Sequence, residues 1–288
     1  MNRILICPSQ RPASRFLAET APLAIVPLLG QGLVEYWLTH LAGSRVRNVL
    51  ILSDDRAHQI RDVVGKGERW GLQVQVLEEP RELTPAQAFL KHQKALEVGA
   101  AENHIITLDH FPGAPELPIF EGYNEWFAAL QGWVPRARTP DRVGLRELKP
   151  GIWVGLNSHI SPDAELRGPC WLGKNVHVGA RAIIGPNAIV ENGAFVESDA
   201  AISDGFVGPD TYVGRFSEIV RSLAWGNTLV NLESNSITKV PDPFLLCALR
   251  RPRASQTNSW LTRISELCSR NKAEVHLLWK HILMNKEG

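Results

Sequence analysis

Charged side chains that could bind a ligand follow runs of residues typical of buried β-strands. The charged residues, each with the run before it, are Arg11 and Arg15 (after 3–7), Glu79 (after 73–77) and Asp109 (after 104–108). In a parallel α/β sheet the carboxyl ends of the strands lie along one edge, and ligands bind at that edge. We therefore expect a binding site there, built from guanidinium groups and carboxylates.

The elements that would position these residues alternate along about the first 145 residues. Apolar residues at helical spacing occupy 31–42, further helices are predicted over 57–66 and 85–98, and short apolar runs typical of strands lie between them. Pro85 falls in the first turn of its helix, where a missing N–H costs little. Alternating strands and helices indicate a parallel sheet with helices on both faces.

A six-residue repeat follows, and it is the strongest pattern in the chain. Aliphatic residues recur at every sixth position and, after one shortened step, the series continues; they are Ile160, Leu166, Leu172, Val178, Ile184, Val190, Val196, Ile202, Val207, Val213 and Ile219. This period fits a three-sided β-solenoid in which each side contributes one aliphatic residue to the interior. Residues 152–238 would form roughly four to five coils.

Composition excludes several classes of protein. The chain has 288 residues, and 31 lysines and arginines against 30 acidic residues give a net charge of +1, which argues against a dedicated nucleic-acid binder. The four cysteines are far apart and lack the spacing of a zinc site or a disulfide framework. We find no apolar run long enough to span a membrane and no signal peptide. We therefore expect a cytoplasmic protein that binds no nucleic acid.

Residues 241–288 differ from the repeat. Pro241 and Pro243 end it, a basic stretch follows at 250–253, and helical spacing returns over 260–268 and 274–284. Apolar residues of the last segment fall on one helical face. One hypothesis is a helix that packs on the solenoid or on a neighbouring subunit. The alternative is a helix that binds a membrane surface or a partner, aided by the basic linker.

Residues 22–38, PLAIVPLLGQGLVEYWL, resemble a segment of the sugar-1-phosphate nucleotidyltransferases, and further motifs follow in that family's order. Residues 4–15 stand where the family has its Gly-rich nucleotide loop, 79–88 where it has "EP…LGTAxA", and 108–109 where it has the metal-binding "GD". Many such enzymes, including the mannose-1-phosphate guanylyltransferases, carry a hexapeptide-repeat left-handed β-helix after the catalytic domain. Residues 149–155 resemble its start, so the resemblance covers about residues 1–240.

The resemblance implies roles for the charged residues. Gln10, Arg11 and Arg15 would lie in the nucleotide loop, with both arginines at the phosphates. Glu79 would meet an edge of the base, and Asp109 would hold Mg²⁺, which bridges phosphate oxygens in such enzymes.

The nucleotide loop departs from the family pattern. Residues 9–13 replace G-x-G-T-R, so both glycines that let backbone N–H groups approach the triphosphate are gone. Pro12 removes a further backbone donor, and the family's lysine falls on Leu23.

The sugar-binding half of the family's domain is also missing. Only about 40 residues separate Asp109 from the first coil near Gly151, and they hold one predicted helix over 121–132. Such a segment cannot build a full sugar-1-phosphate pocket, so we expect catalysis to be degenerate.

A second hypothesis is acyl transfer. Hexapeptide acyltransferases bind acyl-CoA between adjacent β-helices of a trimer, often with a histidine as general base. His159 and His177 lie in the repeat, and His177 is the candidate. Because His177 precedes the inward-pointing Val178, we expect it to point outward or to lie near a corner.

The sequence thus predicts an α/β + β-solenoid protein. A reduced Rossmann-like nucleotidyltransferase domain (1–145) precedes a left-handed parallel β-helix (151–240) and a basic linker with a helical tail (241–288). We expect a nucleotidyltransferase-like scaffold or regulatory subunit of sugar-nucleotide or surface-polysaccharide metabolism. The alternatives are an active sugar-1-phosphate nucleotidyltransferase that uses Mg²⁺ and a pocket completed by another subunit, and a hexapeptide acyltransferase that uses acyl-CoA.

The expected partners follow from the same features. A nucleotide or sugar nucleotide would bind the first domain, and the exposed faces of a solenoid favour a homo-oligomer, a trimer ahead of a dimer. Trp153, Trp171 and Trp225 either form a contact surface or lie under the N-terminal domain or the C-terminal helix. Residues 260–284 would dock a membrane-bound glycosyl-phosphate transferase, which would place the protein at the inner membrane face.

Overall fold

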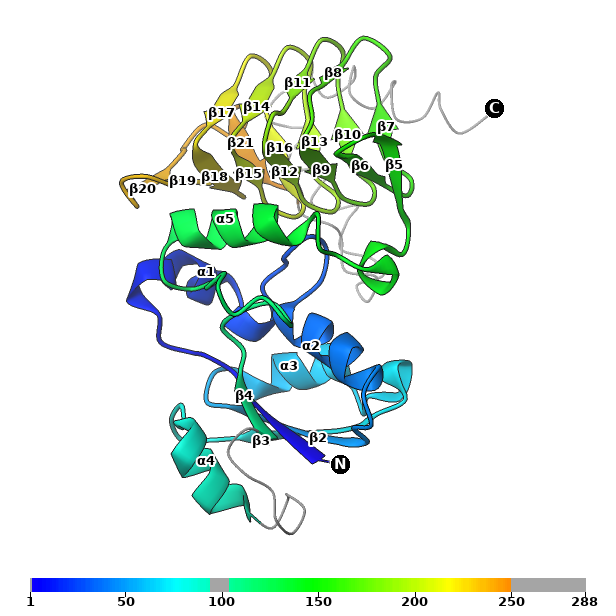
Figure 1. The fold of residues 1–288 in the computed structure, drawn as a ribbon. Helices are drawn as coiled ribbons and strands as arrows, with labels where there is room; N and C mark the ends of the chain where they lie inside the picture. Colours follow the sequence, from blue (N-terminus) through cyan, green and yellow to red (C-terminus); the bar gives the residue numbers. More distant parts are fainter. Residues whose placement is uncertain (1, 94–103, 250–288) are drawn as a thin grey trace, which may run out of the picture. The chain divides into compact units, whose positions relative to one another are not determined.

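The N-terminal sheet has four parallel strands in the order β3-β2-β1-β4 (Figure 1). This computed structural model describes residues 2–93 and 104–249. The strands are β1 (Asn2–Ile6), β2 (Asn48–Ser53), β3 (Gln73–Glu78) and β4 (Ile105–Thr107). The helices are α1 (Arg15–Thr20), α2 (Leu33–Ala42), α3 (Ala57–Val64), α4 (Pro85–His92) and α5 (Tyr123–Trp133). The predicted parallel sheet is confirmed.

Helices cover both faces of this sheet, because successive residues of a strand point to opposite sides. Leu5 on β1 belongs to the large core that also contains residues of α2 and α3. Ile4 and Ile6 on the same strand belong to a smaller apolar cluster with Ala88 of α4. The alternation of strands and helices in the sequence therefore indicated the correct layering.

The start of α4 shows why the chain becomes helical at the predicted position. The Thr84 hydroxyl accepts a hydrogen bond from the Gln87 N–H at 3.3 Å, and the Gln87 side chain accepts one from the Thr84 N–H at 3.2 Å. This reciprocal capping box satisfies two backbone donors, and Pro85 occupies the first turn. Most of the predicted range beyond His92, and the helices predicted over 260–268 and 274–284, lie outside the described residues.

The six-residue repeat forms a parallel β-helix with three sheets, as predicted. His177 pairs with His159, eighteen positions earlier, whereas Tyr212 pairs with Phe195, seventeen positions earlier, because the shortened step removes one residue from the coil. An eight-stranded sheet contains β5 (Leu145–Lys149), β6 (Ile152–Gly155), β9 (Cys170–Leu172), β12 (Ala188–Val190), β15 (Phe206–Val207), β18 (Ser222–Trp225), β19 (Thr228–Asn231) and β20 (Ile237–Lys239).

The other two sheets complete each coil. A five-stranded sheet contains β7 (His159–Ile160), β10 (His177–Val178), β13 (Phe195–Val196), β16 (Thr211–Val213) and β21 (Leu246–Ala248). A four-stranded sheet contains β8 (Glu165–Leu166), β11 (Ile183–Ile184), β14 (Ala201–Ser203) and β17 (Glu218–Val220). All of the aliphatic residues of the repeat belong to one interior cluster or pack against it, which confirms the predicted stack.

Antiparallel strands close the last coil. Parallel pairing in the eight-stranded sheet ends at β18, which pairs antiparallel with β19, and β19 pairs antiparallel with β20. β21 pairs antiparallel with β16 on the five-stranded sheet. The repeat period suggested coils as far as residue 238, but these antiparallel strands replace the last one. They cover the open strand edges that parallel coils would otherwise leave.

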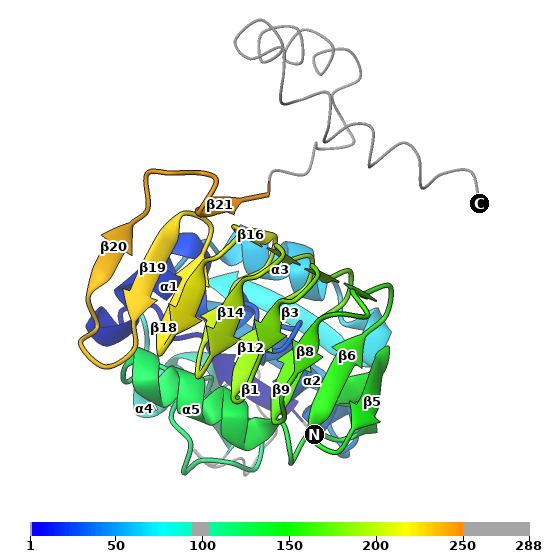
Figure 2. The same ribbon diagram turned by 90° about the horizontal axis from the view of Figure 1, so that it is seen from above.

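Helix α5 joins the N-terminal part to the β-helix by covering the eight-stranded sheet (Figure 1, Figure 2). Trp126 of α5 is fully buried, and its ring meets that of Phe206 edge to face at 4.6 Å. The outward side chains of the sheet join the core of the α/β part; they are Trp171, Ile189, Phe206, Leu223 and Val230. The alternative in which the tryptophans of the coils lie under the N-terminal domain is therefore the correct one for Trp171.

A buried carboxyl group provides a second junction. Glu191, at a corner of the β-helix, is fully buried and accepts a hydrogen bond from the Gly30 N–H at 3.2 Å. Gly30 (φ 85°) lies in a tight turn that needs the left-handed conformation. Burial raises the pKa of Glu191 to about 7, although backbone N–H groups of Asn192, Leu29 and Gly30 oppose the shift.

We predict that Trp126→Ala lowers the free energy of unfolding by about 3–5 kcal/mol, because it leaves a cavity between α5 and the β-helix. Urea denaturation measures this change. Phe244, which is 72% exposed, supplies the control, and Phe244→Ala should cost less than about 0.5 kcal/mol. A loss below about 1 kcal/mol for Trp126→Ala would show that the helix does not hold the two parts together.

We also predict a pH dependence from Glu191. Its folded pKa lies above its unfolded pKa, so between about pH 4.5 and 7 the folded chain keeps a proton that the unfolded chain has released. Stability should therefore fall as pH rises through this window, by at most about 3 kcal/mol. Glu191→Gln should flatten the profile measured by urea denaturation, whereas Glu218→Gln, at an exposed position, should not. Parallel profiles for wild type and Glu191→Gln would contradict the assignment.

Candidate functional site

The loop after β1 is closed by an ion pair. Two guanidinium nitrogens of Arg11 donate to the two carboxylate oxygens of Glu82, at 2.9 and 2.7 Å. The backbone N–H of Ser9 donates to the same carboxylate at 3.0 Å, and its hydroxyl lies 3.4 Å from it. Glu82 thus receives a backbone N–H and a bidentate guanidinium, which are groups that bind a phosphate in other proteins.

The pKa values of Glu82 and Arg11 both favour the charged forms that make this ion pair. Burial would raise the pKa of Glu82, but hydrogen bonds from Arg11 and Ser9 outweigh it and hold the pKa below its usual range. The hydrogen bond to Glu82 likewise raises the pKa of Arg11, with the charges of Asp109 and Asp54 adding to it. At neutral pH one guanidinium therefore stands among several carboxylates. This surrounding favours a cationic side chain and opposes an incoming triphosphate.

Asp54 and Cys7 complete the loop's surroundings. The Ser9 hydroxyl donates to Asp54 at 2.9 Å, which ties the end of β1 to the residue after β2. Cys7 is buried, and burial together with the negative charge of Asp54 raises the pKa of its thiol far above the ordinary value. Its thiolate is therefore suppressed, and Cys7 is a packing residue and not a nucleophile.

The structure does not bring the other predicted nucleotide residues to this cluster. Arg15 lies on α1 and pairs with Glu19 one helical turn later, on an exposed surface. Gln10 is exposed, and its backbone carbonyl accepts a hydrogen bond from the neighbouring Arg11 side chain at 2.9 Å.

Glu79 is committed to α4. Its side chain is buried, with one carboxylate oxygen bonded to Lys91 and the other 2.7 Å from Nε2 of His92. Burial would raise the pKa of Glu79, but these hydrogen bonds outweigh it and lower the pKa. The carboxylate that the family would offer to a base edge thus anchors a helix here.

The predicted Mg²⁺ ligand, Asp109, lies next to a histidine. Asp109 follows β4 and is half exposed, and one of its carboxylate oxygens lies 2.6 Å from Nδ1 of His110. Within residues 2–93 and 104–249, no three acidic, histidine or cysteine side chains gather as a metal cluster. Mg²⁺ in such sites relies on one or two carboxylates plus substrate phosphates. Since Glu82 takes the phosphate-binding donors, no catalytic step through Mg²⁺ follows from this geometry.

Aromatic residues of the segment after Asp109 pack on the rest of the fold. Phe111 is fully buried, and its ring stacks on Trp133 of α5 at 4.6 Å with an interplanar angle of 5°. The Phe16 N–H donates to the Tyr123 hydroxyl at 2.9 Å, which fixes the start of α5 to α1. The predicted helix over 121–132 is present as α5, and its apolar face serves the contact with the β-helix.

His177, the acyl-transfer candidate, lies in a ladder of stacked rings on the outer face of the five-stranded sheet. Its ring is 4.2 Å from Phe195 and 6.5 Å from His159, and Phe195 stacks further on Tyr212. The expected outward orientation is therefore observed. Burial, and then the nearby His159, lower the pKa of His177. Among the described residues, no hydrogen bond orients its imidazole, as a general base would need.

The sequence did not indicate which residues pair with Arg11, in the loop after β1, and with Glu79. Glu82 meets Arg11 across 71 positions, and Lys91 and His92 meet Glu79 from the next helix. An arginine in a loop without glycines does signal the need for a counter-ion. No local pattern shows which carboxylate supplies it.

Comparison with known proteins supports the assignment of the first part. Residues 16–118 match the family model described as nucleotidyl transferase. This segment is nucleotidyltransferase-like. The matched residues run from α1 to the loop after β4, so they include Glu79, Glu82 and Asp109 but none of the β-helix. No curated protein matches the chain.

Solved structures of low identity also match the chain. PerB from Caulobacter crescentus, in complex with CoA and GDP-perosamine, is 15% identical over 64% of this chain and 95% of that one, with a TM-score of 0.20. A point mutant of perosamine N-acetyltransferase from the same organism, with the same two ligands, is 15% identical over 64% and 95%, with a TM-score of 0.21. Those ligands belong to those proteins.

Within residues 2–93 and 104–249, no helix is long and apolar enough to cross a bilayer.

We predict that Glu82→Ala creates an anion site in the nucleotidyltransferase-like segment. The variant frees the Arg11 guanidinium and the Ser9 N–H, so inorganic pyrophosphate should bind at least about tenfold more tightly than to wild type. Calorimetry measures the change. Glu78→Ala removes the same charge at an exposed neighbouring position and is the control. Equal affinities for the two variants would show that Glu82 does not block the loop.

Proposed function

We propose that this chain is a scaffold or regulatory subunit of sugar-nucleotide or surface-polysaccharide metabolism and does not transfer nucleotidyl groups by itself. The observation that carries the proposal is the Glu82 carboxylate, which takes the Ser9 backbone N–H and the Arg11 guanidinium donors of the loop. Because Glu82 belongs to the same chain as these donors, its effective concentration near them is high, and a free nucleotide must compete with it for them.

The requirements of the reaction support the proposal. Nucleotidyl transfer joins a sugar phosphate to the α-phosphorus of a nucleoside triphosphate and expels pyrophosphate, and most of its catalysis is positioning and neutralisation of charge. Here Arg11 is neutralised by Glu82, and Glu79 is held by α4. An active enzyme would need a second subunit to supply both a cationic loop and a sugar pocket.

Acyl transfer gains no support from His177. Its ring packs in a ladder between His159 and Phe195 and lacks an orienting partner in the described chain. A general base needs such a partner to hold one tautomer toward the substrate.

Assembly with other chains is part of the proposal. Among residues 2–93 and 104–249, the α/β part covers the eight-stranded sheet, and the five-stranded sheet has its ladder of rings on its outer face. We infer that coils of neighbouring copies associate, as a trimer or a dimer, and that residues 260–284 bind a membrane-bound glycosyl-phosphate transferase. That segment lies outside the described residues. Loss of residues 250–288 should then abolish membrane association, and unchanged association would contradict this part.

A pyrophosphate-release assay tests the proposal. ATP, CTP, GTP and UTP, each with glucose-1-phosphate or mannose-1-phosphate and Mg²⁺, should release no pyrophosphate above background, because the loop donors are already occupied. Asp109→Ala should leave this baseline unchanged, as should Asp163→Ala, an exposed aspartate of the β-helix. Release that Asp109→Ala abolishes and Asp163→Ala preserves would establish an active enzyme and overturn the proposal.

A further inference from the structure

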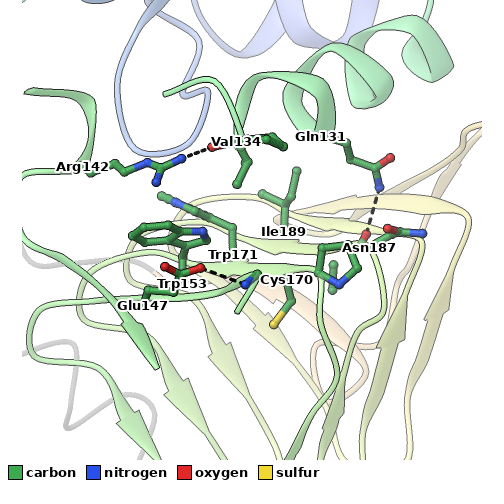
Figure 3. Close-up of a pocket in the computed structure, with 13 residues that line it drawn as sticks. Gln131, Val134, Arg142, Glu147, Trp153, Cys170, Trp171, Asn187 and Ile189 are labelled. Carbon is green, nitrogen blue, oxygen red and sulfur yellow. Dashed lines mark hydrogen bonds between the residues drawn. The ribbon is translucent and has the colours of Figure 1, made fainter. Parts of the chain in front are cut away.

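A cavity opens where α5 ends. Val134 and Pro135, which follow α5, face strands β6, β9 and β12 of the eight-stranded sheet across a gap. The space left is a cavity of about 440 Å³ (Figure 3). This volume lies within the range of small-molecule sites. The residues at the strand ends of the α/β sheet do not line it.

The floor of the cavity is a row of outward side chains on neighbouring strands. Glu147 pairs with Trp153 across β5 and β6, and Trp153 pairs in register with Trp171 on β9. Ile189 on β12 continues the row. Trp171 is 4% exposed and Trp153 is half buried, so the floor is mainly aromatic, with one carboxylate at its end.

Polar groups stand around this floor in fixed positions. The Arg142 guanidinium lies 4.0 Å from the centre of the Trp153 ring and donates to the Val134 carbonyl. Figure 3 shows Arg142 and Gln131 on the same side of the floor as the end of α5. Gln131 donates to the Asn187 carbonyl at 3.3 Å. These contacts hold the side chains in place before a ligand arrives, which reduces the ordering cost of binding.

Glu147 is held in the same way. Its carboxylate accepts a hydrogen bond from the Gly151 N–H at 2.9 Å, and this bond leaves further lone pairs free toward the cavity. A carboxylate accepts stronger hydrogen bonds than a neutral oxygen does.

The chemistry of the lining selects a class of ligand. Arg142 and Glu147 balance in charge, so the lining favours a neutral molecule over a phosphate ester, which needs a cluster of cations. The lining contains the donors Arg142 and Gln131 and the acceptor Glu147, and hydroxyl groups both donate and accept. The negative face of an indole ring attracts polarised C–H groups.

We propose that this cavity binds a hexopyranose ring, with C–H groups against the tryptophans and hydroxyls on Glu147, Arg142 and Gln131. The ring belongs to a free sugar or to a larger glycan or glycoconjugate, and the shared chemistry is the uncharged pyranose. The inference stands independently of nucleotidyl transfer, because it uses none of the residues around Arg11.

Ligand-observed NMR on the full chain tests the proposal. The probes are the methyl pyranosides of glucose, mannose and galactose, and N-acetylglucosamine. A ligand of this size should bind with Kd on the order of 1 mM. Glu147→Gln keeps an acceptor for the Gly151 N–H but removes the charge, so it should weaken binding at least about fivefold. Glu165→Gln, an exposed glutamate elsewhere on the β-helix, is the matched control and should leave binding unchanged.

Three results would overturn the proposal. One is the absence of binding of every probe to wild type at roughly ten times the expected Kd. Another is equal binding by Glu147→Gln and Glu165→Gln, which would place the sugar elsewhere. The third is displacement of the bound pyranoside by GMP or UMP at lower concentration than by a second pyranoside, which would show a nucleotide site.

Discussion

The outward apolar side chains on one sheet of the β-helix must be kept from water, and the rest of the chain is arranged around this constraint. Trp171, Phe206 and Leu223 point away from the interior stack, so they would form a large apolar patch without a cover. Helix α5 supplies the cover through Trp126, and behind it the same core continues to β1. The α/β part and the β-helix therefore share one core.

The residues after Asp109 contribute to this contact, because α5 meets the β-helix through Trp126. In the nucleotidyltransferase-like segment, Glu82 neutralises Arg11 inside the fold. The junction at Glu191 holds the loop at Gly30 against the same β-helix, so the two parts are joined at two separate places.

Local patterns in the sequence predicted the fold well, and long-range contacts explain what they missed. The six-residue period specified the interior of the β-helix, because each step repeats the same burial, and helical spacing located α2 and α5 within about two residues. The sequence could not show that Trp171 faces α5, that Glu82 pairs with Arg11, or that antiparallel strands end the coils. These features depend on partners far along the chain, and the residue types involved are also common on surfaces.

Native-state hydrogen exchange tests the shared core most directly. Amides of β2 in the α/β sheet and of β12 in the β-helix lie on opposite sides of the junction made by α5. If one core joins the two parts, the slowest amides of both strands should open with the same free energy, within about 1 kcal/mol, in a single global unfolding. Exchange of β2 through a separate opening that is several kcal/mol easier than that of β12 would show two independent domains and contradict the account.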